Sequence, residues 1–180
     1  MRKTTIANIA VIAAMGALLS TGAESGRAKD EALIYGVVVN EAMTNCATSP
    51  STSVVLLGYT KPQLWDDFAK RHLAEAPASH TTAVADFLRR SADRKDVKHL
   101  LPEGYRVVDL ELKGMWPQPT SDYVVWVSSI GFDSRREHAV VASGCICPIG
   151  LNLCGSSKLQ LFVREQGKWH ATGVTLQTMF

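Results

Sequence analysis

The spacing of apolar residues along this chain changes once, near Tyr105, and that change limits the folds the chain can adopt. Before it, apolar side chains recur at helical spacing, as at Val84, Phe87 and Leu88. After it, short runs rich in valine and leucine alternate with polar turns, a pattern typical of strands. Helices first and strands later favour an antiparallel sheet over alternating βαβ units. The sequence therefore predicts an α+β fold in which N-terminal helices pack on one face of a C-terminal antiparallel β-sheet.

The individual elements follow from the same periodicity and from capping and turn residues. Asp30 precedes an apolar helical pattern and is expected to cap the N-terminus of that helix. The segment from Thr60 to Gln63 resembles a capping box with proline in the first turn, and predicts the start of the next helix. Gln166–Gly167 separates two apolar runs and predicts a hairpin turn. We expect helices at about residues 30–44, 60–75 and 81–92, and extended segments at 53–59, 107–114, 123–132, 138–147, 158–164 and 169–176.

The first 23 residues have the layout of a secretory signal. A positive head is followed by an apolar run at residues 6–19 and by small residues at Thr21 and Ala23. We expect cleavage after Ala23, with a cut after Ala28 as the alternative, which leaves residues 24–180 as a single α+β domain. A membrane-anchoring helix is the other interpretation, but the run is too short to span a bilayer and remain there. The sequence thus predicts a periplasmic or secreted protein.

The balance of charge argues against two classes of partner. The formal net charge of +2 includes Arg2 and Lys3, which leave with the signal, and the remaining 17 basic residues match the 17 acidic ones. A neutral chain without a basic stripe has no electrostatic footprint for nucleic acid or an anionic membrane. We therefore expect no nucleic-acid partner, and no membrane span after processing.

Four cysteines follow the signal segment, so export would bring them into an oxidising compartment. Cys145 and Cys147 share one face of an expected strand, and a turn containing proline and glycine carries Cys154 back toward Cys147. Cys147–Cys154 is therefore the pair that closes most easily, which leaves Cys46 to reach Cys145. Sequence alone does not choose among the three possible pairings. Three thiols and a histidine could instead hold zinc, but the spacing is not a CxxC knuckle, so we expect no metal and no cofactor.

No catalytic motif stands out in the sequence. There is no Gly-x-Ser-x-Gly elbow and no His-Glu-x-x-His motif. Ser128–Ser129 lies in an expected strand and fits small residues beneath a helix, with a nucleophile as the alternative. Asp66–Asp67 lies in the first turns of an expected helix, where the pair complements the macrodipole. We assign no catalytic residue, and expect structural or surface roles for the five histidines, which are His72, His80, His99, His138 and His170.

Trp116 is the one tryptophan expected outside the core. It lies between Gly114 and two prolines, Pro117 and Pro119, which predicts a rigid, exposed connection. Aromatic side chains held on rigid loops are frequent contact sites. Trp116 is therefore the candidate binding residue.

From Ser129 onward the chain resembles a family of small exported bacterial proteins with no established activity. The shared pattern is a serine that shortly precedes a Gly-Phe pair, two apolar strands flanking a glycine-containing turn bounded by cysteines, and a Gly-Lys-Trp hairpin. Asp133 stands where the family often has asparagine, and Cys46 and Cys145 lie outside the pattern. The resemblance implies an antiparallel-sheet core and carries over no catalytic residue. The matching residues are Ser129, Gly131, Phe132, residues 139–141, Cys147, Cys154, Gly155, Leu159, Leu161, Gly167, Lys168 and Trp169.

These observations lead to one expectation and two alternatives. We expect an exported, non-catalytic binding or interaction module that contacts a macromolecule or a component of the cell envelope. The first alternative is a hydrolase or thiol-dependent enzyme with a Cys/Ser–His site, which would need a free thiol or a reactive serine in a cleft. The second is an inhibitor of an exported enzyme, which sequence does not separate from the first expectation.

Overall fold

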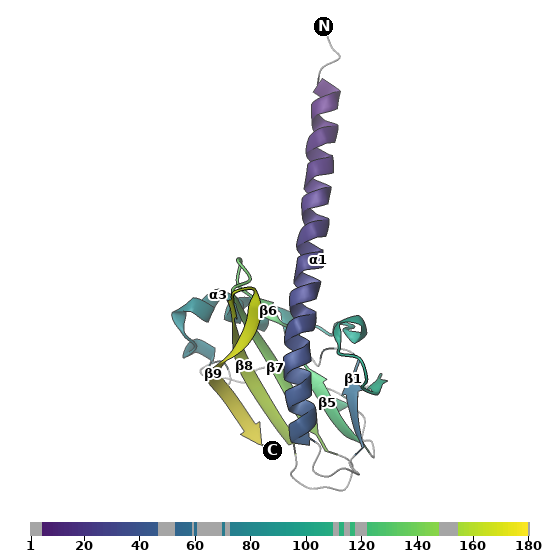
Figure 1. The fold of residues 1–180 in the computed structure, drawn as a ribbon, viewed down its shortest axis with the longest axis vertical. Coiled ribbons are helices and arrows are strands. Elements are labelled where there is room, and N and C mark those ends of the chain that lie inside the picture. Colours follow the sequence, from purple (N-terminus) through teal and green to yellow (C-terminus); the bar gives the residue numbers. More distant parts are fainter. Residues whose placement is uncertain are drawn as a thin grey trace.

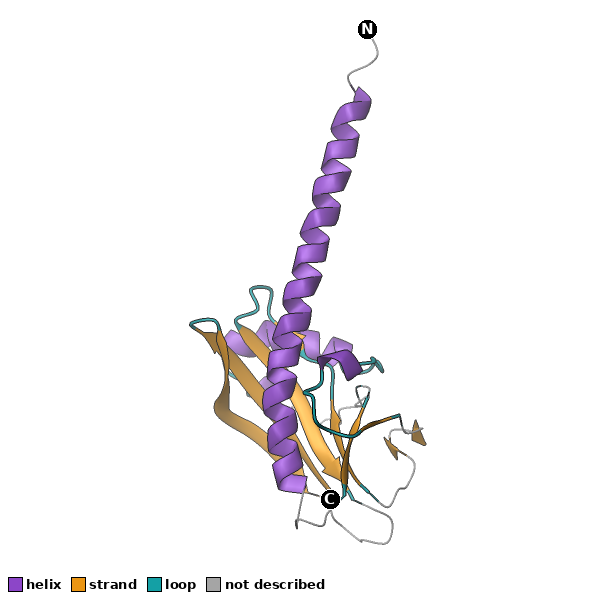
Figure 2. Ribbon diagram, turned by 45° about the vertical axis from the view of Figure 1, so that its right-hand side comes forward, coloured by secondary structure: helices purple, strands orange, loops and turns teal. Residues whose placement is uncertain are grey.

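The computed structural model describes residues 5–46, 53–58, 60, 70, 73–109, 112–113, 116–117, 122–147 and 155–179. One long helix, α1 (Thr5–Cys46), runs past the sheet and extends beyond it toward the N-terminus (Figure 1). The shorter helix α3 (Thr81–Arg90) lies on the far side of the sheet (Figure 2). Two 3₁₀ helices, η1 (Ala78–His80) and η2 (Lys98–Leu100), lie before and after α3 in the chain. In the part of the chain so described, no helix has both the length and the apolar character needed to cross a membrane.

The main sheet contains seven of the described strands, in the order β2-β1-β5-β7-β8-β9, with β6 paired to β7. β1 runs parallel to β2 and β5, whereas the pairings that join β5 to β7, β6 to β7, β7 to β8 and β8 to β9 are antiparallel. The fold is thus α+β, as predicted, but the sheet is mixed because an early strand joins those of the second half. The strands are β1 (Val54–Leu57), β2 (Val107–Val108), β5 (Tyr123–Val127), β6 (Gly131–Phe132), β7 (His138–Ile146), β8 (Gly155–Glu165) and β9 (Lys168–Met179), and β3 (Leu112–Lys113) pairs with β4 (Trp116–Pro117) in a separate ribbon.

The helices cover both faces of the sheet, so the expectation that they share one face is wrong. In β5, Val125 and Val127 belong to the core beneath α1, whereas Val124 and Trp126 belong to the core beneath α3. Successive strand residues point to opposite faces, so both faces of the central strands are buried. The continuous apolar run in β5 already indicates burial on both faces, because a strand with one solvent-exposed face would alternate apolar and polar residues.

Helix α1 begins well before Asp30, so the expected N-cap at this residue is wrong. The helix continues through Asp30, whose side chain is buried, and the indole Nε1 of Trp169 donates a hydrogen bond to Asp30 Oδ1 at 3.2 Å. A capping preference is local, and here tertiary contacts of the same carboxylate decide its place. Asp30 is therefore an anchor between α1 and β9.

Two glycines meet backbone requirements that other residues would not. The β8–β9 turn has positive φ at Gln166 (50°) and Gly167 (79°), which confirms the predicted hairpin. At Gly131, in β6, an added Cβ would lie 2.2 Å from the backbone nitrogen of Phe87. Helix α3 therefore approaches the sheet closely because position 131 has no side chain.

The other expected elements agree in part with the structure. β1, α3, β7 and the hairpin strands lie where the sequence predicts them, whereas β5 ends at Val127, before the expected residue 132. The expected helix at 60–75 lies almost entirely outside the described residues.

Candidate functional site

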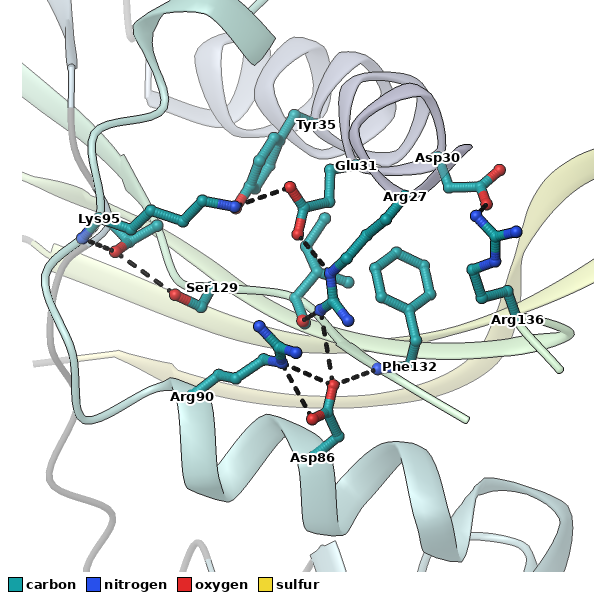
Figure 3. A network of polar contacts seen from close by, with 12 residues as sticks. Arg27, Asp30, Glu31, Tyr35, Asp86, Arg90, Lys95, Ser129, Phe132 and Arg136 are labelled. Carbon is teal, nitrogen blue, oxygen red and sulfur yellow. Dashed lines mark hydrogen bonds and ion pairs between the residues drawn. The ribbon is translucent and has the colours of Figure 1, made fainter. Parts of the chain in front are cut away.

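Among the described residues, the buried charges gather where α1 crosses the sheet, in a network centred on Glu31 (Figure 3). Only 4% of the Glu31 side chain is exposed. Arg27 donates from Nε to Glu31 Oε1 at 3.0 Å, and Lys95 donates from Nζ to Glu31 Oε2 at 2.9 Å. A buried carboxylate is tolerated when cations and hydrogen-bond donors surround it. Glu31 thus ties α1 to the segment that follows α3.

Arg27 also joins α1 to the layer on the other face of the sheet. Its Nη2 donates to the carbonyl oxygen of Ile130 at 2.9 Å and lies 3.5 Å from Asp86 Oδ2. Its guanidinium carbon lies 4.8 Å from the ring centre of Phe132, within cation–π range. One side chain therefore connects α1, the β5–β6 connection and α3.

Asp86, on α3, completes this network. The backbone N–H of Phe132 donates to Oδ2 at 3.1 Å, Arg90 Nε donates at 2.9 Å, and Arg89 forms a further ion pair. Burial acts to raise the pKa of Asp86, but the hydrogen bonds from Phe132, Arg90 and Arg89 outweigh it, so the pKa lies below its usual value. Asp86 is therefore a charged structural bridge.

A second cluster surrounds Asp30. In addition to the indole of Trp169, Arg136 Nη1 lies 3.4 Å from Asp30 Oδ2 and Arg164 Nη1 lies 3.6 Å from Asp30 Oδ1. Arg136 has a left-handed backbone conformation, with φ of 55°.

An open depression of about 580 Å³ lies between the two clusters. Its lining consists of Arg27, Thr82, Asp86, Phe132, Asp133, Ser134 and Arg136.

The chemistry available in this depression is limited by the pairs around it. Its two arginines already bind carboxylates, and Asp133 Oδ2 accepts a hydrogen bond from His138 Nδ1 at 2.9 Å. A polar ligand would therefore compete with internal ion pairs. The depression is therefore an open surface hollow in which both arginines are already paired.

A third cluster consists of His80, at the end of η1, and His138, at the start of β7. The rings of His80 and His138 meet edge to face, with centres 4.7 Å apart. His80 is buried, and its Nε2 lies 3.2 Å from the Phe162 carbonyl oxygen, which fixes Nε2–H as the donor. His80 Nδ1 then accepts from the hydroxyl of Ser79, at 3.1 Å. Burial, reinforced by repulsion from His138, holds the pKa of His80 below its usual value.

The cysteines contribute cross-links in the structure. Cys46, at the end of α1, is bonded to buried Cys145 in β7, with a Cα–Cα distance of 5.7 Å. Cys147 is also in a disulfide, and Cys154, its expected partner, lies outside the described residues. None of the three described cysteines thus carries a free thiol. Among the described residues, no three metal-ligating side chains are grouped as they would be in a metal site.

The remaining predicted site residues differ in how the structure places them. Ser128 and Ser129 are buried, and the Ser128 hydroxyl donates to the Ser129 carbonyl and accepts from the Ala142 amide, both at 2.9 Å. This bonding supports the structural role expected for Ser128. Trp116 lies in β4, where it pairs with Lys113, but its side chain is outside the described part. Asp66, Asp67 and His72 are outside it as well.

The Arg27, Glu31 and Lys95 network was not foreseen from the sequence. The signal was present in α1, where Arg27 and Glu31 have i,i+4 spacing and two acids interrupt an apolar face. Lys95 lies within the charged stretch at residues 93–98, where no pattern in the sequence indicates a buried partner. Its backbone is held by Thr60, whose Oγ1 accepts from the Lys95 amide at 2.8 Å.

Comparison of the chain with protein-family models, curated proteins and solved structures gave no match.

Proposed function

We propose that this protein is an exported, non-catalytic module that binds a macromolecule or a component of the cell envelope through the outer face of α1. The observation that carries the proposal is the exposure of Leu33 (49%) and Val37 (42%). These residues are one helical turn apart and form a pair that we call the α1 ridge. Lys29 and Asn40 are the exposed residues one turn before and after the ridge. An apolar centre with a polar rim is the usual composition of a protein-binding surface.

The rigidity of α1 supports a role in recognition. The Cys46–Cys145 disulfide fixes its C-terminal end, and Glu31 fixes it where it enters the domain. Between these points, Glu41 accepts from Gln160 Nε2 at 2.8 Å and forms an ion pair with Lys158. A preorganised surface loses little conformational entropy when it binds. The ridge is thus held in one orientation before a partner arrives.

Export, and placement in the periplasm or outside the cell, form part of the same proposal. A disulfide of wide sequence separation, 99 residues, fits an oxidising compartment. The resemblance to small exported bacterial proteins points the same way. An inhibitor of an exported enzyme would be one kind of partner relationship within this proposal.

The test compares capture by immobilised protein from envelope and secreted fractions. The Leu33→Ser/Val37→Ser double variant is expected to lose a partner that the wild type retains, because it removes the apolar centre of the ridge. Val107→Ser is the matched control, since Val107 is an exposed valine (36%) on the edge strand β2. Trp116→Ala tests the contact residue expected from the sequence. An identical set of captured species for the wild type and the ridge variant contradicts the proposal.

A hydrolase is the second candidate, and the Ser79–His80 contact is the observation that favours it. Ser79 is exposed, and its hydroxyl donates to a neutral imidazole, as an activated serine would. A fluorophosphonate probe should then label the wild type, and Ser79→Ala should abolish the label. Absence of labelling on the folded protein removes this candidate.

A further inference from the structure

The two edges of the main sheet differ in length and in charge. One edge is β2, which has only two residues and lies between Arg106 and Asp109. The other is β9, which has twelve residues and pairs with β8 on one side only among the described strands. Figure 1 shows β9 at the outer edge of the sheet. Among the described residues, the long edge is therefore the one with the longer run of unpaired backbone donors and acceptors.

The part of β9 at residues 171–179 lacks the charged residues and prolines that normally protect an edge strand. Proteins block such edges with lysine, proline or very short strands. Residues 171–179 contain no charged residue and no proline, whereas threonine and valine, which favour strands, occupy four of these nine positions. The β2 edge, in contrast, is short and flanked by charge. This contrast indicates that, of the two edges in the described part of the chain, β9 is the one suited to pairing.

The second half of β9 has the regularity that pairing needs. The β8–β9 register shifts between Gln160 and Phe162, which marks an irregularity near the middle of the strand. Beyond it, Thr175 to Met179 pair one by one with residues of β8 without interruption. A regular ladder on the inner side places the outer N–H and C=O groups at even spacing along the edge.

We propose that the β9 edge binds a second copy of this chain, with the two β9 strands antiparallel across a two-fold axis. Self-pairing sets an uncharged segment against the same uncharged segment, so no like charges face each other. Helices already cover both faces of the sheet, which leaves the edge as the place where the sheet can grow. Such pairing would give one continuous sheet through both copies, the isologous contact of a two-fold dimer. The α1 ridge takes no part in it, so this inference is independent of the proposed function.

Sedimentation velocity over a concentration series tests the inference on the exported, disulfide-bonded protein. The wild type should show a monomer–dimer equilibrium. Thr178→Lys should weaken the dimer about tenfold or more, because it introduces like charges that approach across the two-fold axis. Val107→Lys is the matched control, since it places the same charge on the β2 edge, and it should dimerise as the wild type does.

A second variant keeps the test decisive if Thr178→Lys does not fold, as judged by circular dichroism. Gln177→Glu places a carboxylate opposite Lys158 within the chain, which favours folding, while the two carboxylates repel each other between copies. Amide exchange should slow in β9 as the dimer forms. A wild type that stays monomeric, or a dimer that both β9 variants leave unchanged, overturns the inference. So does protection of β9 that arises only when a different protein is added.

Discussion

At the scale of single residues, the interior of this protein depends on carboxylates that have more than one partner. Glu31 contacts Arg27 and Lys95, Asp30 contacts Trp169 and two arginines, and Asp86 contacts a backbone amide and three arginines. Desolvation of an unpartnered carboxylate would oppose folding strongly, so each of these groups is stable only as part of its cluster. Tyr35 shows the effect of burial directly, because burial next to Glu31 raises the pKa of its phenol well above the usual value.

His80 makes stability depend on pH in the mildly acidic range. Its pKa is lower in the folded protein than in the unfolded chain, where it is near 6.5. The unfolded state therefore binds the proton more readily, and the stabilisation is complete above about pH 6.5 and is lost as pH falls toward the folded pKa. Asp133 partly offsets this effect, while His138 adds to it. We expect the free energy of unfolding to fall between pH 7.5 and 5.5, measured by urea denaturation.

The controls for this prediction are histidine variants that keep size and polarity. His80→Gln retains a donor for the Phe162 carbonyl and should flatten the pH dependence in this range. His99→Gln changes an exposed histidine and should behave as the wild type does. Equal slopes for the wild type and His80→Gln would show that His80 is not the group responsible.

At the scale of elements, the packing of α3 against β6 depends on Gly131. A methyl group at this position would lie 2.2 Å from the Phe87 nitrogen and 2.4 Å from the Ala83 carbonyl oxygen, both of which are backbone atoms. Because backbone cannot rotate away, Gly131→Ala should destabilise the protein by roughly 3 kcal/mol, the upper part of the range for overpacking. Gly36→Ala is the matched control, since nothing lies within 4 Å of its added Cβ. In helix α1 it should stabilise by about 0.5–1 kcal/mol. Similar unfolding midpoints for the two variants would contradict this account.

The elements that the sequence predicted well are those set by local chemistry. The β8–β9 turn follows from Gln166–Gly167, and α3 from a strongly amphipathic segment. Two features needed knowledge of contacts distant in sequence. Parallel pairing of β1 with β5 joins residues about seventy positions apart, and the role of Asp30 depends on Trp169, which lies in the last hairpin. No period or cap in the sequence contains that information.

The candidate site was predictable only in part for the same reason. The Cys46–Cys145 bond was the pair left after the easiest closure was chosen, and the structure contains it. The Arg27, Glu31 and Asp86 network was missed, because i,i+4 spacing in α1 identifies one pair but not its partner on α3. Ser79 and His80 are adjacent in sequence, yet the carbonyl oxygen that accepts from His80 Nε2 belongs to Phe162 in β8.

At the scale of the whole molecule, the long helix and the rest of the domain are joined at both ends of their contact. The disulfide holds the C-terminal end of α1 on β7, and Arg27 holds the other end across the β5–β6 connection to α3. The position of Arg27 in this arrangement bears on where the signal segment expected from the sequence would be cut. A cut after Ala23 retains Arg27, whereas a cut after Ala28 removes it and leaves Ile130 and Asp86 without that donor.

The intact mass of the exported protein measures processing and cross-linking together. We expect a mature chain of residues 24–180, because only the earlier cut preserves the contacts of Arg27 with Glu31 and Asp86. Its mass should be lower by one hydrogen per cysteine, and an alkylating reagent should add nothing until the protein is reduced and denatured. The reduced, denatured sample, with all four cysteines alkylated, is the internal control. A chain that begins at Lys29 would show that Arg27 is dispensable for the fold. Alkylation of the native protein would instead reopen the thiol-dependent and metal-binding alternatives.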